Sequence, residues 1–186
     1  MTRNTDWAAE AARLADTGMY LPEEEHASCG VGLVTAIDGK PRRDVVEKGI
    51  MALKAVWHRG AVDADGKTGD GAGIHVEIPT AFFEDQIRRT GHEPGAGRLA
   101  VGQVFLPRTD FGAQETARTI VESEVLRLGY YIYGWRQVPV NIRVLGEKAN
   151  ATRPEIEQIL IANTKDTDEE TFERELYVIR RRIEKA

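Results

Sequence analysis

The 186-residue sequence has one cysteine, Cys29, and no long hydrophobic run. A single cysteine cannot form a disulfide within the chain, and it cannot hold an iron–sulfur cluster, which needs several thiolates. No stretch approaches the roughly 20 apolar residues that span a bilayer, and residues 1–20 lack the apolar core of a secretory signal. These absences predict a cytoplasmic protein with no membrane partner.

A concentrated basic face is also missing. The chain carries 25 Lys and Arg against 30 Asp and Glu, for a net charge of −5. Nucleic-acid phosphates need a basic surface, and the one basic run, Arg180–Arg182, stands beside Glu175 and Glu184 and is typical of a solvated helix face. No nucleic-acid partner is therefore predicted. No metal is predicted either, because no two of the four histidines stand at metal-ligand spacing.

The pattern of the chain changes abruptly at Cys29. The leader, residues 1–28, has a predicted helix at 4–18 and ends in an acidic, polar run. Beyond it strands and helices mix, which indicates an α+β or layered α/β fold. Strands are predicted at 29–37, 72–78, 99–106, 130–133 and 138–144. Helices are predicted at about 44–57, at 82–87 and 110–129, after Pro154, and from about 168 to the end.

The last predicted helix keeps an apolar stripe almost to Ala186, with no glycine or proline stop. This favours a chain that is incomplete at its C-terminus, and a docking helix that simply ends the protein is the alternative.

Cys29 is the main candidate for chemistry. A free cysteine is most often a buried apolar residue, but this one begins a predicted strand, lies between Ser28 and Gly30, and directly follows the leader. Cleavage before Cys29 would place an α-amino group, with a pKa of about 7.7–8.0, on the same residue as the thiol. Such an amine can act as the base for its own nucleophile.

Three motifs then stand in order along the chain. They are His26-Ala27-Ser28-Cys29-Gly30-Val31-Gly32, Trp57-His58-Arg59-Gly60-Ala61-Val62 and Thr68-Gly69-Asp70-Gly71-Ala72-Gly73-Ile74. Together with Gly146-Glu147-Lys148-Ala149 and residues 175–181, they resemble the class II glutamine amidotransferase domain that opens the large subunit of bacterial glutamate synthases. That domain is an N-terminal nucleophile hydrolase.

The resemblance implies a four-layer αββα sandwich, a removable leader at 1–28, and an incomplete amidotransferase domain at 29–186. It implies that Cys29 is the catalytic nucleophile and that Arg59 and Gly60 line the site for L-glutamine. The implied partners are the rest of the large subunit and a small NADPH-oxidising subunit. The implied cofactors, namely FMN, an iron–sulfur cluster, FAD and NADPH, belong to the parent enzyme, and none is expected in this segment.

The sequence departs from the family in one respect. The Asn-Gly pair that forms the family's oxyanion hole occurs nowhere in the chain. Losing one oxyanion donor lowers the rate by about 10²–10³-fold, so this chain alone is predicted to have little or no glutaminase activity.

Two alternatives stay open at this stage. The glycine-rich loop from Thr68 to Gly73 could suggest a phosphate site, but the glycines precede a predicted strand and not a helix, which favours close backbone packing. In that interpretation Asp70 orders the wall of the site. More broadly, the chain could be a non-catalytic interaction or regulatory module in which the leader is retained and Cys29 is buried.

Overall fold

The computed structural model describes residues 7–17, 30–57, 60–165 and 167–186, and the chain divides into two compact units, 1–53 and 54–186. The first unit contains α1 (Trp7–Thr17) and most of α2 (Arg43–Ala55). Both helices were expected from the apolar periodicity. None of the residues of α2 is buried, so the apolar stripe predicted for this helix is not part of a core.

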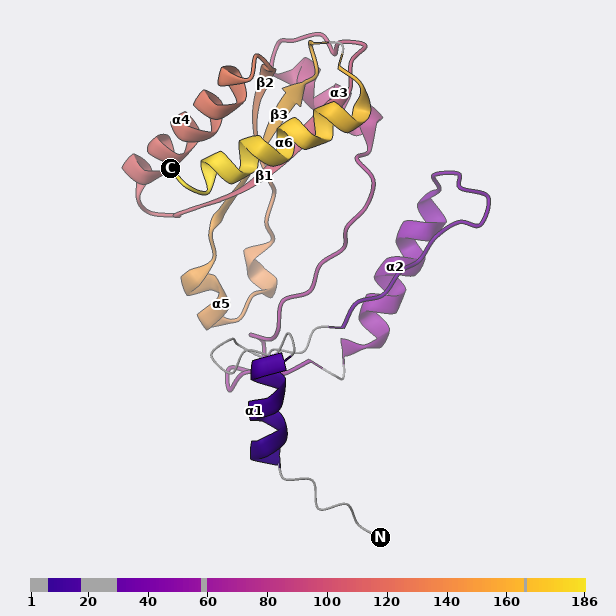
Figure 1. Cartoon of the computed structure of the whole chain (residues 1–186), viewed down its shortest axis with the longest axis vertical. Coiled ribbons are helices and arrows are strands. Elements are labelled where there is room, and N and C mark those ends of the chain that lie inside the picture. The colour runs from indigo at the N-terminus through magenta and orange to yellow at the C-terminus, as the bar shows by residue number, and fades with distance from the viewer. Residues whose placement is uncertain (1–6, 18–29, 58–59, 166) are drawn as a thin grey trace. The chain divides into compact units, whose positions relative to one another are not determined.

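The second unit is built on a three-stranded antiparallel sheet in the order β1-β3-β2 (Figure 1). The strands are β1 (Leu99–Leu106), β2 (Tyr131–Gln137) and β3 (Glu155–Ala162). The central strand, β3, aligns its Ala162 with Leu99 of β1 and with Tyr131 of β2. The register of β2 shifts between Ile132 and Gly134, where the glycine has a positive φ of 135°.

Alternate residues of β3 enter two separate cores. Ile159 and Ile161 pack with residues of α4 (Phe111–Arg127) and α6 (Glu169–Ile183). Leu160 and Ala162, on the other face, pack with residues of α3 (Thr80–Arg89). The sheet is therefore covered by two helices on one face and by one helix on the other, an α+β arrangement, as expected.

The helix predicted after Pro154 is wrong, because this segment is the central strand. Proline at the first position of a helix is a common start signal, yet Glu155–Ala162 is rich in β-branched isoleucine and its apolar side chains are buried on both faces. A short run that is apolar on both faces suits a central strand as well as a buried helix, and the pairing with β1 and β2 decides between them.

Three predicted strands are not found. Of the strand predicted at 29–37, the structure describes residues 30–37, which form no strand and end in a turn closed by a hydrogen bond from Gly39 N to Ala36 O (3.0 Å). Residues 72–78 form neither helix nor strand, and the segment 138–144 ends in a 3-10 helix, η2 (Ile142–Val144). Apolar composition alone does not make a strand when no neighbouring strand satisfies its backbone. The short helix α5 (Glu147–Thr152) was not predicted.

Among the residues that the structure describes, no helix is both long enough and apolar enough to cross a membrane.

Candidate functional site

Of the three predicted site residues, Gly60 alone is described, and Cys29 and Arg59 lie outside the described residues. The Gly60 backbone N–H donates to the carbonyl of Trp57 (3.0 Å) in a tight turn. A Cβ at this position would lie 3.3 Å from the same carbonyl oxygen, a close approach that glycine avoids. The described part of the predicted site is therefore Gly60 and the loop that follows it.

This loop, residues 61–70, closes on itself as a small hairpin. Ala61 N donates to the Asp70 carboxylate (2.8 Å), and Asp70 N donates back to the Ala61 carbonyl (3.3 Å). Val62 and Gly69 form an isolated antiparallel bridge. A Cβ on Gly69 would meet the Ala61 carbonyl oxygen at 2.9 Å, so the two arms can approach this closely only with glycine there. The close backbone packing predicted for this glycine-rich motif is confirmed at Gly69, and Asp70 orders the loop.

The tip of the hairpin is organised around the Asp65 carboxylate. Its oxygens accept hydrogen bonds from the Thr68 hydroxyl (2.5 Å) and from the backbone N–H groups of Thr68 (2.6 Å) and Lys67 (2.9 Å). These donors stabilise the charged form and hold the pKa of Asp65 far below its ordinary value, with the Thr68 hydroxyl as the largest contribution. Asp65 therefore holds the loop in its charged form.

The hairpin is attached to the start of α5. The Lys148 ammonium donates to both oxygens of Asp63 (2.8 and 2.9 Å), and Ala149 N donates to the Thr68 hydroxyl (3.4 Å). A Cβ on Gly146 would lie 2.1 Å from the Thr68 hydroxyl oxygen and 2.4 Å from a carboxylate oxygen of Asp65. Glycine at 146 is thus required for the contact. We call this contact, made by Asp63, Asp65, Thr68, Gly146 and Lys148, the loop clamp.

The loop clamp brings together segments that are far apart in the sequence. The motif around Gly60, the motif from Thr68 and the motif from Gly146 are separate in the sequence. The structure joins them over a separation of 85 residues between Lys148 and Asp63. No local pattern signals such a contact, although the opposite charges of Lys148 and Asp63 are compatible with it.

The phosphate-binding interpretation of the glycine-rich loop gains no support. Such a site needs a helix that starts directly after the loop, so that its N–H groups point at the phosphate. Residues 71–79 are neither helix nor strand, and α3 begins only at Thr80. The loop is used for backbone packing.

Comparison with known proteins identifies the family. Residues 29–186 match the family described as class II glutamine amidotransferases. The chain is 66% identical over 181 residues to the glutamate synthase [NADPH] large chain of Azospirillum brasilense, and 39% identical over 172 residues to that of Bacillus subtilis. It is 36% identical over 163 residues to a ferredoxin-dependent glutamate synthase of Arabidopsis thaliana.

These alignments cover 97%, 90% and 87% of the chain but only 12%, 11% and 10% of the respective relatives. The chain thus spans about an eighth, or less, of the proteins it resembles. Because the family match extends over all of residues 29–186, the chain belongs to the class II glutamine amidotransferases.

Proposed function

We propose that this chain supplies the nucleophile of a glutaminase site in a glutamate synthase, with Cys29 exposed as the amino terminus by removal of residues 1–28. The observation that carries the proposal is the start of the family match at residue 29, the only cysteine of the chain. The 66% identity to a glutamate synthase large chain supports the choice of parent enzyme.

The proposed reaction is hydrolysis of the glutamine side-chain amide. The Cys29 thiol passes its proton to the new α-amino group, and the thiolate sulfur attacks the amide carbon. The carbon–nitrogen bond breaks and ammonia leaves with a proton from that amine, so that a thioester remains. Water then cleaves the thioester, which gives glutamate and restores the thiol.

Arg59 and Gly60 are proposed to line the glutamine pocket. An arginine guanidinium forms charge-assisted, two-pronged hydrogen bonds with a carboxylate, which suits the α-carboxylate of the substrate. The loop clamp supports this role, because the hairpin that begins directly after Gly60 is held at both its base and its tip.

The later steps are proposed to take place outside this chain. Ammonia would pass to 2-oxoglutarate in the rest of the large subunit, and reducing equivalents would come from NADPH through a small subunit, FAD, FMN and an iron–sulfur cluster. The chain does not fit the cluster, because clusters are held by several cysteine thiolates and this chain has one cysteine. We propose a cytoplasmic location for the same assembly.

The decisive experiment combines intact mass with covalent labelling. Protein isolated from its native source should have the mass of a chain whose first residue is Cys29. An electrophilic glutamine analogue should label Cys29 there, and excess L-glutamine should slow the labelling. Cys29→Ala is the matched control that should take up no label. Retention of residues 1–28 together with an unreactive thiol would instead establish the alternative, a non-catalytic interaction or regulatory module.

The isolated chain supplies a second test. Without an Asn-Gly pair it should release little or no ammonia from L-glutamine, even when produced with Cys29 as its first residue. Rapid ammonia release from this chain would show that its own residues complete the oxyanion hole.

A further inference from the structure

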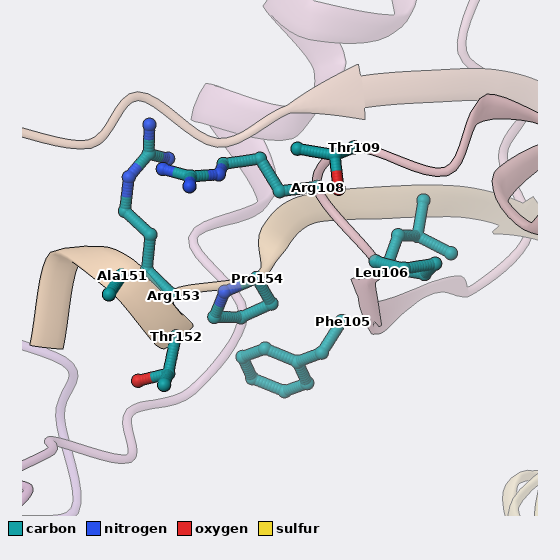
Figure 2. Close-up of a pocket in the computed structure, with 9 residues that line it drawn as sticks. Phe105, Leu106, Arg108, Thr109, Ala151, Thr152, Arg153 and Pro154 are labelled. Atoms are coloured by element: carbon teal, nitrogen blue, oxygen red, sulfur yellow. The ribbon is translucent and has the colours of Figure 1, made fainter. Parts of the chain in front are cut away.

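Two arginines from different segments converge at the C-terminal end of α5. Arg108 follows β1, and Arg153 follows α5. The Arg108 guanidinium donates to the Asn150 carbonyl (3.2 Å), and the Arg153 guanidinium donates to the Asn150 side-chain oxygen (3.0 Å). Figure 2 shows the two guanidinium groups side by side at one end of a pocket. Two like charges are thus gathered around one neutral residue.

Most of the hydrogen-bonding capacity of these two groups is left over. A guanidinium has five N–H donors, and the described residues engage one donor of Arg108 and one of Arg153. Within the part of the chain that the structure describes, neither arginine has a carboxylate at ion-pair distance, whereas Arg98 and Arg118 each have two. Both side chains are half-buried, so water solvates them only in part.

The rest of the pocket is lined by Thr109, Thr152 and several apolar side chains, and it is large enough for a small molecule. Its volume is about 360 Å³, and its lining includes Phe105, Pro107 and Pro154. Phe105, in β1, is 64% exposed, so its ring is open to a ligand. In Figure 2 the Phe105 ring and Pro154 lie on the side of the pocket away from the guanidinium groups. The pocket therefore has a cationic end, and the apolar side chains of Phe105 and Pro154 lie away from it.

We propose that this pocket binds a small organic anion, with its carboxylate or phosphate group held by Arg108 and Arg153 and its carbon part against Phe105 and Pro154. Arginine pairs suit such groups because each planar fork matches two oxygens of the anion. Occupation would also screen the repulsion between the two guanidinium groups. The inference does not depend on the glutaminase proposal, since Cys29 takes no part in it and labelling of Cys29 can succeed or fail separately.

The test is calorimetric titration of the 186-residue chain with three probes at constant ionic strength: phenyl phosphate, benzoate and inorganic phosphate. Phenyl phosphate or benzoate should bind, and inorganic phosphate should bind at least about threefold more weakly than phenyl phosphate, because it has no carbon part. A preference for phenyl phosphate supports a phosphate ligand, and a preference for benzoate supports a carboxylate ligand. Binding that sodium chloride reproduces at equal ionic strength would overturn the proposal.

Substitutions locate the site. Arg108→Gln and Arg153→Gln should each weaken binding by about tenfold, and Arg153→Lys, which keeps the charge and loses the fork, should still weaken it measurably. Arg181→Gln removes the same charge on α6, outside the pocket lining, and should leave binding unchanged. Unfolding curves verify that each variant is folded. Equal affinity of Arg153→Gln and the unsubstituted chain, or equal loss with Arg181→Gln, would overturn the proposal.

Discussion

The strand β3 and the segment 30–37 are both rich in apolar residues, but β3 is buried and the segment 30–37 is exposed. In β3, Ile159 is 1% exposed and Leu160 is 0% exposed, whereas in the other segment Val31 is 94% exposed and Leu33 is 89% exposed. The difference is the presence of partners, since β3 has a hydrogen-bonded strand on each side and helices over both faces. The apolar pattern indicates what a segment can bury, and the partners decide whether it does.

The largest expected effect on stability comes from the same substitution, leucine to alanine, made once in β3 and once in the segment 30–37. Leu160→Ala should lower the free energy of unfolding by about 2–5 kcal/mol, because it opens a cavity among fully buried residues. Leu33→Ala should change it by no more than about 0.5 kcal/mol, because the side chain is already in water. Urea unfolding followed by circular dichroism measures both values. Equal losses would mean that Leu33 is buried in solution and that the comparison fails.

Ion pairs extend the same contrast to charged residues. Arg118 of α4 forms a two-pronged pair with Glu157 of β3 (2.8 and 2.5 Å), and Glu157 raises the pKa of Arg118. Glu157→Gln should destabilise the chain by about 1–3 kcal/mol, because it weakens charge-assisted hydrogen bonds of a mostly buried group. Glu47→Gln removes the exposed partner of Arg43 in α2 and should have an effect of no more than about 0.5 kcal/mol. A similar loss in the two variants would contradict the assigned difference in burial.

Gly146 in the loop clamp and Gly73 outside it form a matched pair of glycines. Gly146→Ala should cost about 1–3 kcal/mol, because the added methyl overlaps Thr68 and Asp65. Gly73→Ala should be nearly neutral, since nothing lies within 4 Å of a Cβ there. Hydrogen exchange at the Asp63 amide, which is bonded to the Thr68 carbonyl (2.7 Å), reports whether the hairpin opens. Unchanged exchange in Gly146→Ala would show that the hairpin does not need the clamp.

The smallest expected effect is a dependence on pH. Hydrogen bonds from Lys165 and Tyr130 lower the pKa of Glu175 below its ordinary value of 4.5. A depressed carboxylate pKa adds stability that is complete above the ordinary value and is lost as the pH falls through the folded value. Glu175→Gln should therefore lose less stability on acidification below pH 4.5 than the unsubstituted chain, as measured by urea unfolding at a series of pH values. Glu170→Gln on the same helix is the control, and parallel acid profiles for all three proteins would contradict the assignment.

The sequence predicted the elements whose signals are local. The helices α4 and α6 follow Asp110 and Asp168, and each of these carboxylates caps its helix by accepting a backbone N–H three residues later (2.9 Å). The bounds predicted for β1, residues 99–106, also match the structure. Such signals lie within a few residues of the element, so no knowledge of the fold is needed to use them.

The failures concern pairing between distant segments. Pro154 suggested a helix start because its local geometry suits one, and only the two neighbouring strands make the following residues β3. The candidate site likewise combines local motifs with a contact between distant segments. Its motifs and Cys29 were identifiable from the sequence, whereas the contact of Lys148 with Asp63 depends on how the chain returns after 85 residues.

The central position of β3 has a consequence for synthesis on the ribosome. β1 and β2 do not pair with each other, and both wait for a strand that is made after them. While residues 99–154 emerge, each of the two earlier strands offers an unpaired edge, a template on which a second nascent chain can add. We therefore expect slower synthesis of the segment between β2 and β3 to lengthen the time for which those edges stay unpaired, and to favour association of unfinished chains.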